Sequence, residues 1–75
     1  MFTLHFQNKY IHPVNINWMD DTTERLQAVL RPGESYRQGS WQGQQWKVRD
    51  KITNKEIVTF LASKNQDITI KGDSR

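Results

Sequence analysis

Ser40 is the first residue whose chemistry matters, because a serine hydroxyl becomes a nucleophile when a base lies within hydrogen-bond reach and a third group orients that base. The available bases are His5, His12 and scattered carboxylates, and none forms a recognisable motif with Ser40. We therefore expect Ser40 to stabilise a turn through its hydroxyl. His5 is expected at the surface, and the protein is not expected to be an enzyme.

His12 could hold a cation together with the carboxylates of Asp20, Asp21 and Glu24. Their spacing matches no known pattern of zinc or calcium ligands, and the chain has no cysteine to supply thiolate ligands. We expect no metal and no cofactor. The neighbouring Arg49 and Asp50 are interpreted as a strand-end ion pair or a turn cap.

Three tryptophans offer a different chemistry, because indole rings can bind a ligand as well as fill a core. Trp18 continues the apolar alternation of Val14 and Ile16, so it is expected in the core. Trp46 is expected to be a core anchor, since so small a domain needs its large aromatic residues inside. Trp41 lies between glycines in a bend, where full burial is harder, and is expected to be an exposed contact residue.

The composition limits the class of protein. Seventy-five residues make one domain, and the absence of cysteine excludes disulfide bonds. Eleven Lys and Arg against eight Asp and Glu give a net charge of +3, spread as on an ordinary solvated surface. No signal peptide is visible and no segment reaches the roughly 20 apolar residues of a membrane span. The localisation stays open, and it would be cytoplasmic if this is the full-length chain.

Short strands account for the hydrophobic pattern of the whole chain. Alternation between apolar and polar residues predicts strands from Phe2 and from Val14, and again at Gln45–Arg49. Further strands are expected at Leu26–Leu30, Ser35–Gln38, Ile57–Leu61 and Ile68–Ile70. The run Ile57–Leu61 is apolar enough to be buried on both faces, except for Thr59. No stretch favours an amphipathic helix. The pattern predicts an all-β fold, a small sandwich or barrel, over residues 1–71, with a polar tail at 72–75.

Turn residues separate these strands. Turns are expected at 8–10, at 20–23 and after Asp50. Pro32 and Gly33 sit at the two central positions of a type II turn, where Pro presets the first φ and Gly tolerates a positive second φ. Gly39 and Gly43 are expected to enclose a second glycine-marked bend.

Two blocks of residues resemble a known family. They are Pro13-Val14, an aromatic at Trp18 and Leu30-x-Pro32-Gly33, followed by Ser40-Trp41-x-Gly43-x-x-Trp46-x-Val48-Arg49-Asp50. In order and spacing they resemble the β-domain of the von Hippel–Lindau tumour suppressor family from about Asn8 to Leu61, with a loop about two residues longer before Leu30. The resemblance implies a prealbumin-like β-sandwich of about seven short strands.

In that family the domain recognises a hydroxyproline carried on an extended strand, which is β-augmentation. The resemblance carries the pocket serine onto Ser40 and the pocket tryptophan onto Trp46. The histidine that reaches the hydroxyl becomes Gln44, whose amide both donates and accepts hydrogen bonds. Gly39 and Asn15 replace a histidine and a tryptophan, and the pocket tyrosine falls near Gln27. The family's helical domain, which recruits a ubiquitin-ligase adaptor, has no counterpart in these 75 residues.

We therefore expect a non-catalytic module that binds a protein or an extended peptide, with Ser40, Trp41, Gln44 and Trp46 as ligand-binding residues. The alternatives are a small domain that binds nucleic acid or carbohydrate, based on the aromatics and on Gln38, Gln42, Gln44 and Gln45, and a purely structural appended domain. Nucleic acid is the less favoured partner and no membrane association is expected. A homodimer through unpaired edge strands is a further expectation.

Overall fold

The computed structural model describes residues 1–71, and the tail expected at 72–75 lies outside the described residues. Seven strands follow one another along this part of the chain: β1 (Phe2–Asn8), β2 (Val14–Asp20), β3 (Thr23–Leu30), β4 (Ser35–Ser40), β5 (Gln45–Asp50), β6 (Glu56–Leu61) and β7 (Gln66–Ile70). The fold is all-β, so the predicted class and the expected number of strands are confirmed.

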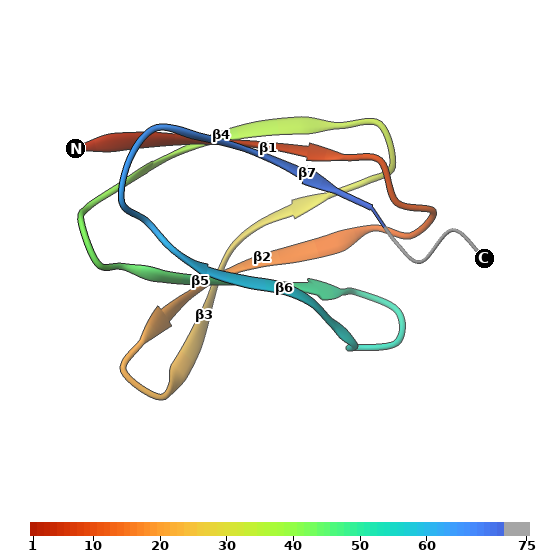
Figure 1. Cartoon of the computed structure of the whole chain (residues 1–75). Coiled ribbons are helices and arrows are strands. Elements are labelled where there is room, and N and C mark those ends of the chain that lie inside the picture. The colour runs from red at the N-terminus through yellow and green to blue at the C-terminus, as the bar shows by residue number, and fades with distance from the viewer. Residues whose placement is uncertain (72–75) are drawn as a thin grey trace.

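The strands form two sheets that pack face to face (Figure 1). One sheet has the order β4-β1-β7 and the other the order β3-β2-β5-β6. All neighbouring strands are antiparallel except β1 and β7, which run parallel. The sandwich therefore has four edge strands: β4 and β7 in the first sheet, and β3 and β6 in the second.

Alternating side chains from both sheets make the core. The first sheet contributes Leu4, Phe6 and Ile70, and the second contributes a larger set: Val14, Ile16, Leu30, Trp46 and Val48. The ring of Phe6 lies 6.3 Å from that of Trp46 and 6.1 Å from that of Phe60, so one aromatic residue of β1 joins the two layers. Trp46 is only 2% exposed, which confirms that it is a core anchor.

The turn between β3 and β4 has the expected geometry. The N–H of Glu34 donates to the carbonyl of Arg31 at 3.0 Å, and Gly33 has a φ of 89°. The second glycine turn is narrower than expected, because Gly39 belongs to β4 and only Gly43, with a φ of 85°, adopts the left-handed conformation. The turn expected at 20–23 is also tighter: Asp20 ends β2 and Thr23 begins β3.

The prediction for β6 was wrong. Its residues are only partly buried and Leu61 is 60% exposed, although the apolar run suggested burial on both faces. The reason is position, because β6 is an edge strand with one face toward the core and one toward solvent. Trp18 is likewise half-buried at the margin of the core, where full burial was expected.

Two β-bulges interrupt the second sheet. Between β2 and β3, Ile16 pairs with Ala28 and Asn17 with Leu26, so Gln27 is the extra residue. Between β5 and β6, Val48 pairs with Val58 and Arg49 with Glu56, so Ile57 is extra. Bulges redirect a side chain and disturb the outer edge of a strand. Both effects bear on the surfaces described below.

Candidate functional site

A hollow of about 210 Å³ opens between the edge strands β3 and β4. We call it the β3/β4 hollow, and its lining residues are Trp18, Gln27, Gln38, Gly39, Trp41, Gln44 and Trp46. Three of the four expected ligand-binding residues line it, and the fourth, Ser40, lies beneath it and contacts two of the others. Three indoles and three amides therefore surround one small space.

Ser40 is fully buried at the end of β4, and its hydroxyl bonds across the β4–β5 turn, as expected of a turn-stabilising residue. Its hydroxyl accepts a hydrogen bond from the indole N–H of Trp46 at 2.9 Å and donates one to Oε1 of Gln44 at 2.8 Å. Ser40 thereby fixes the indole of Trp46 and the amide of Gln44 relative to each other. It supports the floor of the β3/β4 hollow.

Gln44 is held by its amide oxygen alone. Oε1 accepts the hydroxyl of Ser40 and also the backbone N–H of Trp41, at 2.9 Å. Two donors on one oxygen define which end of the amide is the oxygen. Within residues 1–71 the side chain of Gln44 makes hydrogen bonds only through Oε1, so the N–H groups of Nε2 remain free for a ligand that carries an acceptor.

Trp41 and Gln27 form the rim. Trp41 is 61% exposed, which confirms its expected place at the surface. Gln27 reaches the hollow because it is the bulged residue of β3, at the position where the resemblance had placed a pocket tyrosine. Asn15, at the place of the family's first tryptophan, neighbours the fully buried Val14 and Ile16, so its side chain lies on the opposite face of β2.

The free edge of β4 runs beside the hollow. The N–H of Asn8 donates to the carbonyl of Glu34, and this pairing continues two residues at a time along β1 and β4. The backbone groups of Ser35, Arg37 and Gly39 therefore point away from β1, toward the open edge. One of them is already used, since Nε2 of Gln38 donates to the carbonyl of Gly39 at 2.9 Å.

Trp18 is the lining residue that sequence reasoning assigned to a different role. It was expected in the core, but it pairs with Trp46 across β2 and β5 and ends at the margin, where one part of the ring packs inward and another lines the hollow. The alternation along β2 identifies its face but not its distance from the margin of the sheet. Its cross-strand pairing with Trp46 was the missing information.

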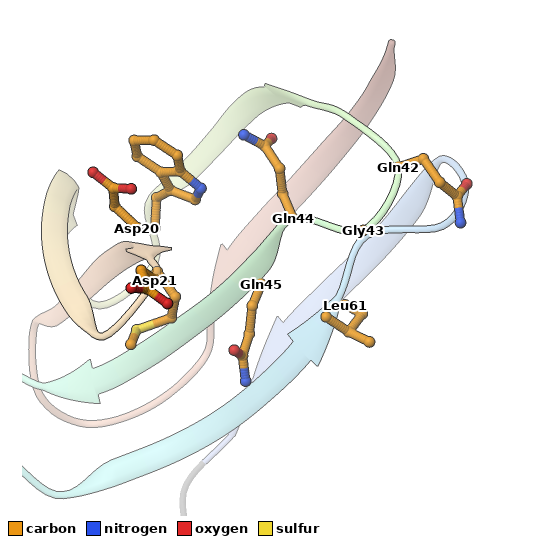
Figure 2. Close-up of a pocket in the computed structure, with 9 residues that line it drawn as sticks. Asp20, Asp21, Gln42, Gly43, Gln44, Gln45 and Leu61 are labelled. Carbon is orange, nitrogen blue, oxygen red and sulfur yellow. The ribbon is translucent and has the colours of Figure 1, made fainter.

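A second hollow, of about 460 Å³, lies on the other side of Gln44 (Figure 2). We call it the Asp20 hollow; it is lined by Trp18, Met19, Asp20, Asp21, Gln42, Gly43, Gln44, Gln45 and Leu61. Figure 2 shows that the side chains of Gln44 and Gln45 point in opposite directions, as successive residues of an extended chain do. Asp20 is paired with Arg25 at 2.7 Å. The polar groups are numerous here but do not converge.

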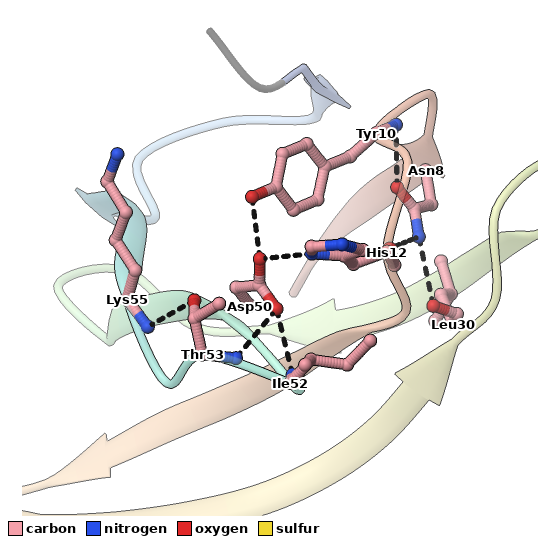
Figure 3. Close-up of polar contacts among 8 residues, drawn as sticks. All are labelled: Asn8, Tyr10, His12, Leu30, Asp50, Ile52, Thr53 and Lys55. Atoms are coloured by element: carbon pink, nitrogen blue, oxygen red, sulfur yellow. Dashed lines mark hydrogen bonds and ion pairs between the residues drawn. The ribbon is translucent and has the colours of Figure 1, made fainter.

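The opposite end of the sandwich holds a buried carboxylate that sequence reasoning interpreted only as a strand-end pair or turn cap (Figure 3). Oδ2 of Asp50 accepts the hydroxyl of Tyr10 at 2.6 Å and lies 2.7 Å from Nδ1 of His12, while Oδ1 accepts the N–H groups of Ile52 and Thr53. Burial opposes ionisation of Asp50, but these hydrogen bonds outweigh it and lower the pKa of the carboxyl group. The hydrogen bond to Asp50 raises the pKa of Tyr10.

This cluster stabilises the turns at this end of the sandwich, because Asp50 links the segment 10–12 to the turn at 51–53. Asn8 donates to the carbonyls of His12 and Leu30 and accepts the N–H of Tyr10. His12 contacts the carboxylate of Asp50. It was weighed as a cation ligand together with Asp20, Asp21 and Glu24, but its ion-pair partner within residues 1–71 is Asp50. The turn-cap interpretation of Asp50 is confirmed, whereas Arg49 pairs with Glu24.

Ionic groups cover the outer face of the second sheet. Arg49 donates to both oxygens of Glu24 at 2.8 Å, and Asn17 donates to Oε1 at 2.9 Å. The hydrogen bonds from Arg49 lower the pKa of Glu24 to about 2, against the opposing effect of burial. Nζ of Lys47 lies 3.8 Å from a carboxylate oxygen of Glu24 and 3.6 Å from one of Glu56. Lys47, Arg49 and the two glutamates therefore form one connected network of ion pairs on this face.

Within residues 1–71, no group of three or more His, Cys, Asp or Glu side chains could hold a metal ion. In the same part of the chain no helix is long and apolar enough to cross a membrane. Models of known protein families and curated proteins give no match to this chain.

Proposed function

We propose that this domain is a non-catalytic module that binds an extended segment of a protein or peptide along the free edge of β4. The observation that carries the proposal is the position of the β3/β4 hollow beside that edge. A strand added to β4 would bond to the outward backbone groups of Ser35 and Arg37 and to the N–H of Gly39. A side chain of the same strand would then enter the hollow.

The hollow suits a side chain that is compact and carries a hydrogen-bond acceptor. Trp18, Trp41 and Trp46 supply apolar walls, and Nε2 of Gln44 supplies donors held in place by Ser40 and the N–H of Trp41. The resemblance of Ser40 and Trp46 to the pocket residues of the von Hippel–Lindau β-domain supports the same location. Hydroxyproline belongs to this chemical class, as do other short polar side chains.

The test is a titration of the ¹⁵N-labelled domain with a library of short synthetic peptides, half of them containing hydroxyproline. The indole N–H signals of Trp18, Trp41 and Trp46 report on the hollow, and the amide signals of Arg37 and Gly39 report on the edge. Binding is expected to shift both sets together. Shifts confined to other strands would contradict the proposal.

A pair of variants separates backbone pairing from side-chain contact. Arg37→Pro removes one outward N–H from β4, whereas Arg37→Ala keeps it, and the exposed position tolerates both changes. We expect Arg37→Pro to weaken a selected peptide at least about tenfold and Arg37→Ala to bind nearly as the parent. Gln44→Glu, which replaces donors by an acceptor, is expected to change which peptides are selected. Equal binding by the two Arg37 variants would exclude β-augmentation at this edge.

The Asp20 hollow favours carbohydrate as a second candidate ligand. Trp18 offers an aromatic face, and the surrounding amides and carboxylates suit sugar hydroxyls. The carboxylates of Asp20 and Asp21 would repel phosphate, so this surface disfavours nucleic acid. Binding of oligosaccharides that Gln42→Ala and Asp21→Ala abolish, on a glycan array, would support this candidate; no binding by the parent domain would remove it.

A further inference from the structure

Within residues 1–71 the strand β7 has one edge without a partner, because it ends the sheet β4-β1-β7. The carbonyl of Ile70 accepts the N–H of Lys9 at 2.9 Å, so the backbone groups of Ile70 face β1. Backbone groups alternate along a strand. Those of Asp67, Thr69 and Lys71 therefore point outward, away from β1.

The side chains of β7 divide by face. Ile70 is buried and Ile68 packs against the core, whereas Asp67, Thr69 and Lys71 are exposed on the outer face. The side chain of Asp67 is 87% exposed, even though it lies 3.4 Å from Nδ1 of His5. The outer face of this strand thus carries, in order, an acidic, a hydroxyl and a basic side chain.

This order is self-complementary in an antiparallel pair of two identical strands. With the two-fold axis at Thr69, each Thr69 stands opposite the other and each Asp67 stands opposite Lys71 of the second copy. On the inner face Ile68 then meets Ile70 of the second copy. Opposite charges and Thr–Thr pairs directly across a ladder are stabilising, and the residues so paired are those whose backbone groups point outward.

The other three edges do not combine these properties. Bulges at Gln27 and Ile57 interrupt β3 and β6, which weakens them as templates for a new strand. β4 is regular, but its central outward residue is Arg37, so a symmetric pair would place two guanidinium groups opposite each other. β7 pairs with β1 without any register shift.

We propose that two copies of this chain form a two-fold dimer by antiparallel pairing of β7, with Thr69 at the axis and Asp67 opposite Lys71 of the second copy. Two three-stranded sheets then become one continuous sheet of six strands, with a β4 edge at each end. The dimer is independent of the proposed peptide binding, since it uses the other edge of the sheet. A single strand pair buries far less than the roughly 1,200 Å² of a stable interface, so the dimer is weak and depends on concentration.

Sedimentation equilibrium of the full chain over a series of concentrations tests the pairing. We expect a monomer–dimer equilibrium. Thr69→Pro removes an outward N–H at the axis of both copies and is expected to raise the dissociation constant at least about tenfold. Thr59→Pro, the matched change on the edge strand β6, should leave the dissociation constant unchanged. Circular dichroism of each variant confirms that the monomer is folded.

A charge exchange tests the register. Asp67→Lys and Lys71→Asp each place like charges opposite one another and should weaken the dimer, whereas the double variant should restore it. A chain that stays monomeric throughout the series, an unaffected Thr69→Pro dimer, or a double variant as weak as the single ones would each overturn the proposal. Peptide titration of Thr69→Pro separates the two proposals, because binding at β4 should survive loss of the dimer.

Discussion

The hydroxyl of Ser40 connects the core to the surface of the domain. It binds the indole of Trp46, which is inside, and the amide of Gln44, which lines the β3/β4 hollow. Most buried polar groups in proteins are hydrogen-bonded, and here one hydroxyl serves a donor and an acceptor together. The same atom therefore contributes to stability and to the shape of the hollow.

Replacing Ser40 by alanine should destabilise the domain by about 1–3 kcal/mol, because the indole N–H of Trp46 is left buried without an acceptor. Urea denaturation followed by tryptophan fluorescence measures the change. Ser35→Ala, at the exposed start of the same strand, is the control and should lie within about 0.5 kcal/mol of the parent. Equal stability of the two variants would contradict the role given to Ser40.

Glu24 should make stability depend on pH in the acidic range. Its pKa is lowered to about 2 in the folded chain by the hydrogen bonds from Arg49. A lowered folded pKa means that the stabilisation is complete above the ordinary pKa of a glutamate and is lost as the pH falls toward 2. The stability difference between the parent and Glu24→Gln should therefore be largest near neutral pH and shrink in acid. Urea midpoints measured for both proteins at several pH values check this, and a difference that does not vary with pH would refute it.

Turns and bulges decide how the strands meet. Gly33 and Gly43 both have positive φ and open space where a Cβ would be, so the backbone conformation and not crowding requires glycine there. Gly39 is the opposite case: it lacks a positive φ, and an added Cβ would meet the flexible side chain of Met1, whose sulfur would lie 2.9 Å away.

Gly33→Ala should cost about 1–2 kcal/mol, the energy of a left-handed conformation for a residue with a Cβ. Gly39→Ala should cost much less, because Met1 can move aside. Thermal unfolding of both variants measures the contrast. The opposite order would show that crowding, and not φ, governs these positions.

The strands and the Pro32-Gly33 turn could be predicted because their signals are local. Alternation of side chains and the φ preferences of two residues are properties of neighbours in the chain. The exposure of Leu61 and the half-burial of Trp18 could not, since both depend on which strand lies at an edge. The bulge that turns Gln27 toward the hollow and the contacts of Asp50 with Tyr10 and His12 likewise arise only after residues about 10 to 40 positions apart have paired.

At the scale of the molecule, stability rests on a few large side chains shared by two sheets. A domain of 75 residues is expected to be stable by only roughly 4–11 kcal/mol. Phe6 is fully buried and contacts the aromatic rings of Trp46 and Phe60 in the facing sheet. Loss of this one ring removes contact between the layers and not only within one of them.

Phe6→Ala should therefore cost about 3–5 kcal/mol, a large share of that stability. Phe6→Leu, which keeps most of the volume, should stay folded. Leu26→Ala, at an exposed position of β3, is the control and should change stability by less than about 0.5 kcal/mol. Calorimetry of the four proteins gives the comparison. A loss for Phe6→Ala as small as that for Leu26→Ala would mean that the sheets do not depend on this contact.

The parallel pairing of β1 with β7 also sets an order in time. The hairpins β2–β3 and β5–β6 join near neighbours, whereas Thr3 donates to the side chain of Asn65, 62 residues away. During synthesis the edge of β1 that pairs with β7 therefore stays unpaired until residues 66–70 have left the ribosome. Until then Ile70 is also missing from the core. The four-stranded sheet can assemble while the chain is still being made. We therefore expect the three-stranded sheet to close last.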